Sequence, residues 1–480
     1  TGAANFTVTG NLSVDGGTIK LDGNYPTGTN NVALGDAALA SGSLSGGDNT
    51  AIGFQALTTN TSGTVNTAVG GDALRYNTTG GNNASLGVNA LKQNTSGSYN
   101  TGIGRSALQS NTTASSNTAV GYQSLTSNTT GTRNVGVGYN TLSLNTTAND
   151  NTSVGHDALD VNTTGAFNTA LGSSALGSNT TAAANTAVGY QALTTNTTGG
   201  DNAAFGYQAA QSNTTGDYLT AIGRQALYNN TTADNNTAVG YQSLYANTTG
   251  SALTAVGTAT LDANTTGVDS TAVGVSALGG NTTGSYNVAI GRTALLNNTT
   301  ASECTAVGYQ AGYTGDAEQG TFIGKDSGKL VTGVKNTFVG AGSGNSVTSG
   351  DRNTILGRYN GNQGGFDCRT RSNHIVLSDG DGNPRLRIDD DGNIKVPQVT
   401  SNTTGNSANM HITSGGEFAK STSSLRYKNT VTVATHGLTE LLTLRPVTYK
   451  GNNDGDTVFG GLIAEEVHDA GLTEFVQYND

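Results

Sequence analysis

The chain has 480 residues, including 70 glycines and 18 tyrosines but only 4 prolines, one methionine and no tryptophan. Only 11% of the residues are charged, and the net charge of −11 argues against nucleic acid as a partner, since phosphate binding needs clustered Lys and Arg. So much glycine with so few aromatic residues is unusual for a compact enzyme, and no apolar run is long enough to predict membrane insertion.

Residues 1–30 are expected to form an N-terminal β leader. Apolar residues alternate at Phe6 and Val8 and again at Leu12 and Val14, and Asp-Gly and Thr-Gly pairs separate such runs. Alternation between turn signals predicts short strands or hairpins. This pattern is typical of a segment that precedes a fibre shaft.

Residues 31–359 are dominated by a 17-residue repeat, of which NTAVGYQALTTNTTGGD (185–201) is one copy. One glycine of the repeat returns every 17 residues from Gly53 to Gly308, and looser copies follow to residue 359. We call this residue the repeat glycine. The period is too short for two-helix repeats, and β-branched runs broken by glycine predict short strands. The expected fold class is therefore all-β, a parallel β-solenoid or β-roll of 17-residue coils stacked at roughly 4.8 Å.

Each coil has a thin expected core. The residue before the repeat glycine is always Val, Ile, Leu or Phe, the fourth residue after it is almost always Leu, and small alanines lie between them. We expect the aliphatic residue and the Leu to fill the core. Asparagines recur four residues before and seven residues after the glycine, which predicts hydrogen-bonded Asn ladders along the stack. Because one coil buries little apolar surface, neighbouring chains are expected to supply the missing burial.

The unit NTAVGYQAL resembles the head repeat of trimeric autotransporter adhesins, a left-handed β-roll with an Asn-Ser-Val-Ala-Ile-Gly-like motif. The period here is longer than in that family. The resemblance implies a homotrimeric β-roll.

Residues 360–397 are expected to be a β-hairpin segment and residues 398–420 a linker rich in Ser, Thr, Asn and Gly. From His374 to Pro397 the pattern predicts strand, turn, strand, turn, strand. Five aspartates in this stretch could suggest a calcium site: Asp379, Asp381, Asp389, Asp390 and Asp391. They lack the spacing of known calcium loops, and Asp-Gly turns explain them better. No metal site and no cofactor are therefore expected.

The two cysteines make neither a disulfide framework nor a zinc site. Cys304 stands where most coils have Asn, so we expect it to be a buried thiol.

Residues 421–480 are expected to be a small α+β segment with an amphipathic helix through Leu438, Leu441 and Leu442. Three pieces of this segment resemble the intramolecular chaperone domain of phage tail fibres and tailspikes, also called the peptidase S74 family. They are Ser423, Arg426 and Lys428, then Leu444, Arg445, Pro446, Val447 and Tyr449, then Gly461 to Val467.

That resemblance implies a domain that trimerises the fibre and then cuts its own chain. Ser423 would be the nucleophile and Lys428 its base, with the cut between Thr422 and Ser423. Ser424 stands where the family often has Asp, and the sequence ends before the helical tail that normally completes the domain. No external substrate is expected.

The expected function is therefore a homotrimeric phage tail fibre in the virion, an extracellular spacer and host-attachment rod. Its partners would be other tail proteins at the N-terminal end and a glycan or protein of the host surface. The position after the repeat glycine varies most, which predicts solvent exposure, and its tyrosines are candidate receptor contacts. These are Tyr122, Tyr139, Tyr190, Tyr207, Tyr241 and Tyr309.

Three other functions remain open from the sequence. The fifteen Asn-Thr-Thr/Ser tracts that begin seven residues after the repeat glycine are N-glycosylation sequons, which would suit a sugar-coated cellular adhesin or filament. A regular threonine row, with Thr50, Thr67, Thr101, Thr118 and Thr152, would suit ice binding. A polysaccharide-degrading tailspike would need paired carboxylates, whereas Asp72, Asp157, Asp160 and Asp262 look scattered along the repeats.

Overall fold

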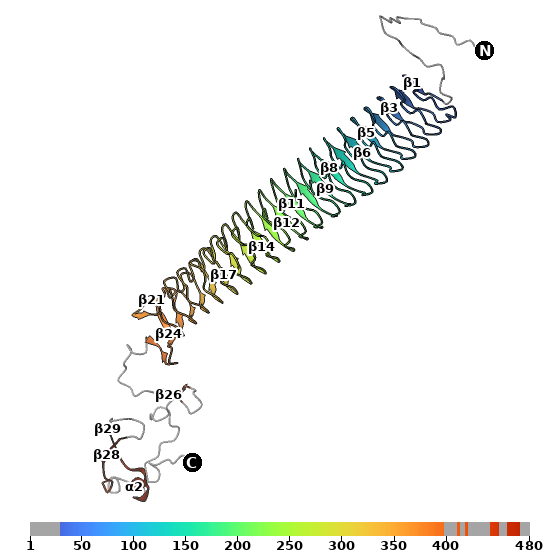
Figure 1. Cartoon of the computed structure of the whole chain (residues 1–480). Helices are drawn as coiled ribbons and strands as arrows, with labels where there is room; N and C mark the ends of the chain where they lie inside the picture. Colours follow the sequence, from blue (N-terminus) through green and yellow to red (C-terminus); the bar gives the residue numbers. More distant parts are fainter. Residues whose placement is uncertain (1–28, 398–409, 413–417, 421–441, 451–457, 471–480) are drawn as a thin grey trace, which may run out of the picture. The chain divides into compact units, whose positions relative to one another are not determined.

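The computed structural model describes residues 29–397, 410–412, 418–420, 442–450 and 458–470 (Figure 1). The chain forms two compact units, residues 1–398 and 399–480, which are described separately. The expected β leader lies outside the described residues, apart from its last two positions, and so does most of the expected linker.

The first unit is a parallel β-solenoid. Strands β1 to β20 and β23 form one column in which each strand pairs in register with the strand of the next coil (Figure 1). Thr186, for example, lies between Thr169 and Ala203, one coil away on either side. At a strand spacing of about 4.8 Å the column is roughly 95 Å long. The predicted fold class is confirmed.

The strands of the column are β1 Val32–Leu34, β2 Thr50–Ile52, β3 Thr67–Val69, β4 Ala84–Leu86, β5 Thr101–Ile103, β6 Thr118–Val120, β7 Val135–Val137, β8 Thr152–Val154, β9 Thr169–Leu171, β10 Thr186–Val188, β11 Ala203–Phe205, β12 Thr220–Ile222, β13 Thr237–Val239, β14 Thr254–Val256, β15 Thr271–Val273, β16 Val288–Ile290, β17 Thr305–Val307, β18 Thr321–Ile323, β19 Thr337–Val339, β20 Thr354–Leu356 and β23 Ile375–Ser378.

The expected core is wrong in one respect: the aliphatic residue before the repeat glycine faces outward. In β10, Ala187 is buried, whereas Thr186 and Val188 are only partly covered. Successive side chains of a strand point to opposite faces, so a buried Asn185 and a buried Ala187 force Val188 outside. The core consists of this alanine, the Leu four residues after the glycine, and the alanine before that Leu.

Two asparagine ladders run through the interior, as predicted. In the first, the Asn66 side-chain amide donates to Asn49 Oδ1 at 3.1 Å and to Gly80 O at 2.9 Å. Asn49 Oδ1 also accepts the backbone N–H of Asn66 at 3.0 Å. The amide therefore satisfies backbone groups that the turns leave unpaired inside a narrow coil.

The repeat glycine permits the close approach of neighbouring coils. Gly70 has a φ of 136°, and a Cβ built on it would lie 2.6 Å from the carbonyl oxygen of Gly87 in the next coil. A side chain at this position would collide with backbone, which cannot move without breaking the column.

The looser coils place their large and small core residues at the opposite positions from the regular coils. Gly312 and Gly328 replace the core Leu, while Phe322 replaces the strand alanine and is fully buried. A Cβ on Gly312 would lie 2.8 Å from both Leu295 and the Phe322 ring. The aromatic ring thus fills the space that the missing Leu side chains leave.

An antiparallel cap ends the column. Strand β23 pairs with β20 on one side and with β24 (Pro384–Ile388) on the other, and β24 pairs with β25 (Ile394–Lys395). The three strands predicted for residues 374–397 are confirmed, although the first of them is also the last rung of the solenoid. The residues before them contain a small hairpin, β21 (Asn362–Gln363) and β22 (Phe366–Asp367).

The second unit is described only in pieces. Strand β26 (Met410–Ile412) pairs with β27 (Phe418–Lys420), and β28 (Val447–Lys450) pairs with β29 (Val458–Gly461), followed by helix α2 (Ala464–Asp469). Of the leucines in the predicted amphipathic helix, only Leu442 is described, and it lies exposed in a turn. No helix in the described segments is long and apolar enough to cross a bilayer.

We predict that Gly70→Ala destabilises the solenoid by about 3 kcal/mol or more, because the methyl group would meet the Gly87 backbone. The adjacent Gly71→Ala is the matched control, since its methyl group would meet no atom within 4 Å. Denaturant unfolding followed by circular dichroism measures both variants. Equal stability of the two would contradict the proposed role of the repeat glycine.

Candidate functional site

The outer face of the column is the surface most able to contact a partner. It carries parallel rows of side chains, because each position of the coil repeats directly above itself. We call the last apolar residue of each column strand, repeated along the stack, the outer aliphatic row. The residue directly after each repeat glycine forms the post-glycine row. The residue five positions before each repeat glycine forms the corner row.

The outer aliphatic row is continuous along the whole column, and none of its members is buried. Thirteen members are 36–50% exposed. The row comprises Leu34, Ile52, Val69, Leu86, Ile103, Val120, Val137, Val154, Leu171, Val188, Phe205, Ile222, Val239, Val256, Val273, Ile290, Val307, Ile323, Val339, Leu356 and Leu377.

The six candidate tyrosines lie in the post-glycine row and are 38–47% exposed. Four of them stack. Tyr139 lies between Tyr122 and His156, with ring centroids 5.2 and 5.0 Å apart, and Tyr190 stacks on Tyr207 at 5.4 Å. Stacking covers the ring faces, so these side chains offer mainly ring edges and hydroxyl groups to a ligand.

Tyr241 and Tyr309 have a different setting. Among the described residues, no ring stacks on either of them. Their neighbours in the row are Arg224 before Tyr241, and Arg292 and Lys325 on either side of Tyr309. Of the six, these two rings have no other ring of the described residues on either face, whereas Tyr122 and Tyr190 each have one stacked face; an apolar ring face is where a sugar ring could pack.

The sequon asparagines are not available to a glycosylating enzyme in the folded coil. All fifteen, from Asn60 to Asn298, are 0% exposed and form the second interior ladder. Asn196 donates to Asn179 Oδ1 at 3.0 Å and to Gly199 O at 2.9 Å, and it accepts from Asn213 at 2.8 Å. A glycan would replace one amide proton and would need space that the interior lacks.

Two acidic residues of one coil interact. Burial raises the pKa of Asp160, and the charge of Asp157 raises it further. Asp157 also has a second neighbour, since His156 Nδ1 lies 2.9 Å from Asp157 Oδ2. The pair belongs to a single coil, so it gives no repeated catalytic arrangement.

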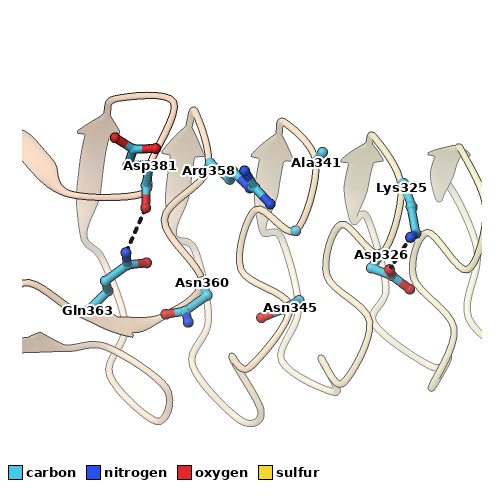
Figure 2. Close-up of a pocket in the computed structure, with 9 residues that line it drawn as sticks. Lys325, Asp326, Ala341, Asn345, Arg358, Asn360, Gln363 and Asp381 are labelled. Atoms are coloured by element: carbon cyan, nitrogen blue, oxygen red, sulfur yellow. Dashed lines mark hydrogen bonds and ion pairs between the residues drawn. The ribbon is translucent and has the colours of Figure 1, made fainter.

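A polar cavity of about 440 Å³ lies on the looser coils (Figure 2). Lys325, Asp326, Arg358, Gln363 and Asp381 contribute to its wall. Gln363 donates to the backbone oxygen of Asp381 at 2.7 Å, and Lys325 lies 3.9 Å from Asp326. No sequence pattern indicates this cavity, because it depends on how the β21–β22 insertion folds beside the column.

The aspartates between residues 379 and 391 lie in turns. Asp379 accepts the backbone N–H of Asn383 at 2.8 Å and pairs with Arg385, which together lower its pKa to about 2. Lys395 donates to Asp389 at 2.7 Å and lowers its pKa likewise to about 2. Oxygens of residues 389–391 lie within 4.8 Å of one another. The Asp-Gly turn interpretation thus accounts for Asp379 and Asp389.

Cys304 is buried, as predicted, and its backbone N–H donates to Asn287 Oδ1 at 2.9 Å, as the asparagines do elsewhere. Burial raises the pKa of the Cys304 thiol, and it raises that of Cys368 to about 11. Both thiols are therefore protonated and unreactive near neutral pH.

Two of the three C-terminal pieces come together. Strands β28 and β29 carry parts of the second and third pieces as a hairpin, and Arg445 Nη2 lies 2.6 Å from Glu466 Oε1. Ser423 and Lys428, the expected nucleophile and base, lie outside the described residues.

Comparison of the chain with protein-family models, with curated proteins and with solved structures finds no match.

We predict that Asn196→Ala lowers the free energy of unfolding by about 2–4 kcal/mol, because it leaves buried polar groups of the ladder without partners. Thr198→Ala removes the same sequon at an exposed position and should change stability by less than about 0.5 kcal/mol. Denaturant unfolding of both variants tests this. A loss of similar size in both would contradict the structural role of the ladder.

Proposed function

We propose that this chain is a structural fibre protein of a phage tail, in which three copies associate along the rod and present it to the host surface. Its place would be the virion, outside the cell. The observation that carries the proposal is the uninterrupted outer aliphatic row.

An aliphatic row of this length favours a permanent partner. Soluble monomers rarely expose long contiguous apolar surfaces, because each square ångström left in water forgoes roughly 25 cal/mol. The row runs straight along a column about 95 Å long. A partner must therefore be equally long and regular, and another copy of the chain meets both requirements.

The phage assignment depends on the sequence resemblance of residues 421–480 to the intramolecular chaperone domain. It is supported by the hairpin β28–β29 and the Arg445–Glu466 ion pair, which bring two of the matching pieces together. The N-terminal end would join the rod to other tail proteins. A host glycan or protein would bind the outer surface, with Tyr241 and Tyr309 as the candidate tyrosines on which no other ring of the described residues stacks.

The second candidate is a cellular surface adhesin built on the same rod. The solenoid would serve either function, but the buried sequon asparagines argue against a glycan coat on the repeats. For ice binding, each outward threonine is flanked by an aliphatic residue rather than by a second threonine row, and the C-terminal resemblance would have no role.

We predict that Val256→Asp/Val273→Asp abolishes self-association, because burying unpaired carboxylates at an interface costs several kcal/mol. Both valines are partly exposed in the single chain, so the fold should persist. The control is Thr198→Asp/Thr215→Asp, which also places two carboxylates on neighbouring coils. Both positions are exposed, and neither belongs to the outer aliphatic row, the post-glycine row or the corner row. Light scattering should give a trimer for the wild type and the control, and 48.3 kDa for the valine variant. A monomeric wild type would refute the proposal.

We further predict that Ser423→Ala prevents self-cleavage. The wild-type chain should appear on a denaturing gel shortened by the mass of residues 423–480, whereas the variant should remain at full length. Lys428→Ala should behave like the serine variant, since the hydroxyl needs a base. An uncut wild-type trimer would show that the C-terminal segment remains as a structural cap and that the protease assignment is wrong.

A further inference from the structure

The corner row and the post-glycine row lie on opposite sides of the outer aliphatic row, and the outward first residue of each strand lies between the corner row and the aliphatic row. Both rows are exposed: Tyr99, Tyr218 and Tyr286 in the corner row are 66%, 61% and 59% exposed. The strand of each coil lies between the two rows. The two positions are six residues apart in the chain, and largely extended backbone of that length spans up to about 20 Å.

The residues in these two rows are matched coil by coil. Among the sixteen coils from Gly53 to Gly308, tyrosine occupies the corner row three times and arginine occupies the post-glycine row three times. These are the same three coils. All three coils also carry Ile before the repeat glycine, but the residue after the arginine is Ser106, Gln225 and Thr293, so the coils are not identical copies. The pairs are Tyr99 with Arg105, Tyr218 with Arg224, and Tyr286 with Arg292.

Further coils follow the same complementarity. Arg133 and Tyr139 reverse the pair, and Asp150 shares a coil with His156, although Arg133 and Asp150 also pair with each other within the corner row at 2.6 Å. Glu303 shares a coil with Tyr309, which combines a carboxylate with a phenol. In none of the sixteen coils do the two rows carry charges of the same sign.

The matched residues do not meet within one chain. In the described part of the chain, the only ring contact of these arginines is made by Arg224, which lies 5.4 Å from Tyr207 in its own row. A cation–π contact needs the guanidinium within about 6 Å of the ring, far less than the span of the strand and its flanking residues. The match therefore has a physical use only between chains.

We propose that the corner row of one chain contacts the post-glycine row of a second copy, with the two copies parallel and in register. This inference depends on the proposed self-association and specifies its geometry. Each Tyr–Arg pair then forms a cation–π contact, and the outer aliphatic rows face the common axis. Because the two rows are different surfaces, the contact passes from each chain to the next and closes as a ring.

The unequal spacing of the pairs selects the register. Tyr99 and Tyr218 lie seven coils apart, whereas Tyr218 and Tyr286 lie four coils apart. An antiparallel partner would reverse this order and could not align all three pairs. A parallel partner shifted by four, seven or eleven coils would align one of the three pairs at most, and any other shift would align none. Only the unshifted parallel arrangement brings every tyrosine of the set to an arginine.

Cross-linking of the full chain tests this arrangement. In Tyr99→Cys/Arg105→Cys, a short bis-maleimide should join neighbouring chains and shift the single-chain band on a denaturing gel to two and three chain masses. The matched control is Tyr99→Cys/Arg224→Cys, which places the same residues in coils seven apart and should stay at one chain mass. The native thiols are buried and should not react. Tyr218→Cys/Arg224→Cys repeats the test elsewhere on the rod.

The outcomes separate this inference from the proposed function. An oligomer by light scattering that gives no cross-link in the matched variants, or equal cross-linking in the control, would overturn the pairing of the two rows while leaving self-association standing. A monomer would overturn both. Cross-linking limited to two chains would support the pairing and would correct the number of chains in the proposed fibre.

Discussion

The in-register stacking of parallel strands is the constraint on which the rest of this structure depends. Because every coil places the same position directly above the last, each side chain has its own counterpart as a neighbour about 4.8 Å away. Residue types whose side chains interact favourably with an identical neighbouring side chain are therefore favoured. Asparagine does so by donating and accepting at once, as the Asn179–Asn196–Asn213 ladder shows, and tyrosine does so by stacking.

The same constraint explains the backbone. The repeat glycines and the left-handed positions, including the core leucine Leu193 with a φ of 50°, would be unfavourable in isolation. Each is held by hydrogen bonds to the coils on either side: the N–H of Leu193 donates to Ala209 O at 3.0 Å. The strain of one coil is thus offset by its neighbours, which is why a single coil has no independent stability.

The period and the short β-branched runs were sufficient to predict a parallel solenoid, and the recurring asparagines were sufficient to predict ladders. The direction of Val188 and its counterparts was predicted wrongly, because large apolar side chains were assumed to be internal. The two-residue alternation that buries Asn185 and Ala187 could have given the answer. The cavity beside Gln363 could not have been predicted, since it depends on an insertion that folds against the column. The expected catalytic pair, Ser423 and Lys428, lies outside the described residues.

Because no residues are inserted between Gly53 and Gly308, the length of this part of the column is proportional to the number of repeats. Adding or deleting one 17-residue unit would change its length by a single step of about 4.8 Å and leave the cross-section unchanged. Since all copies in a homo-oligomer are translated from one gene, such a change would affect every chain equally. The reach of the molecule could therefore evolve in fixed increments without any need for new packing.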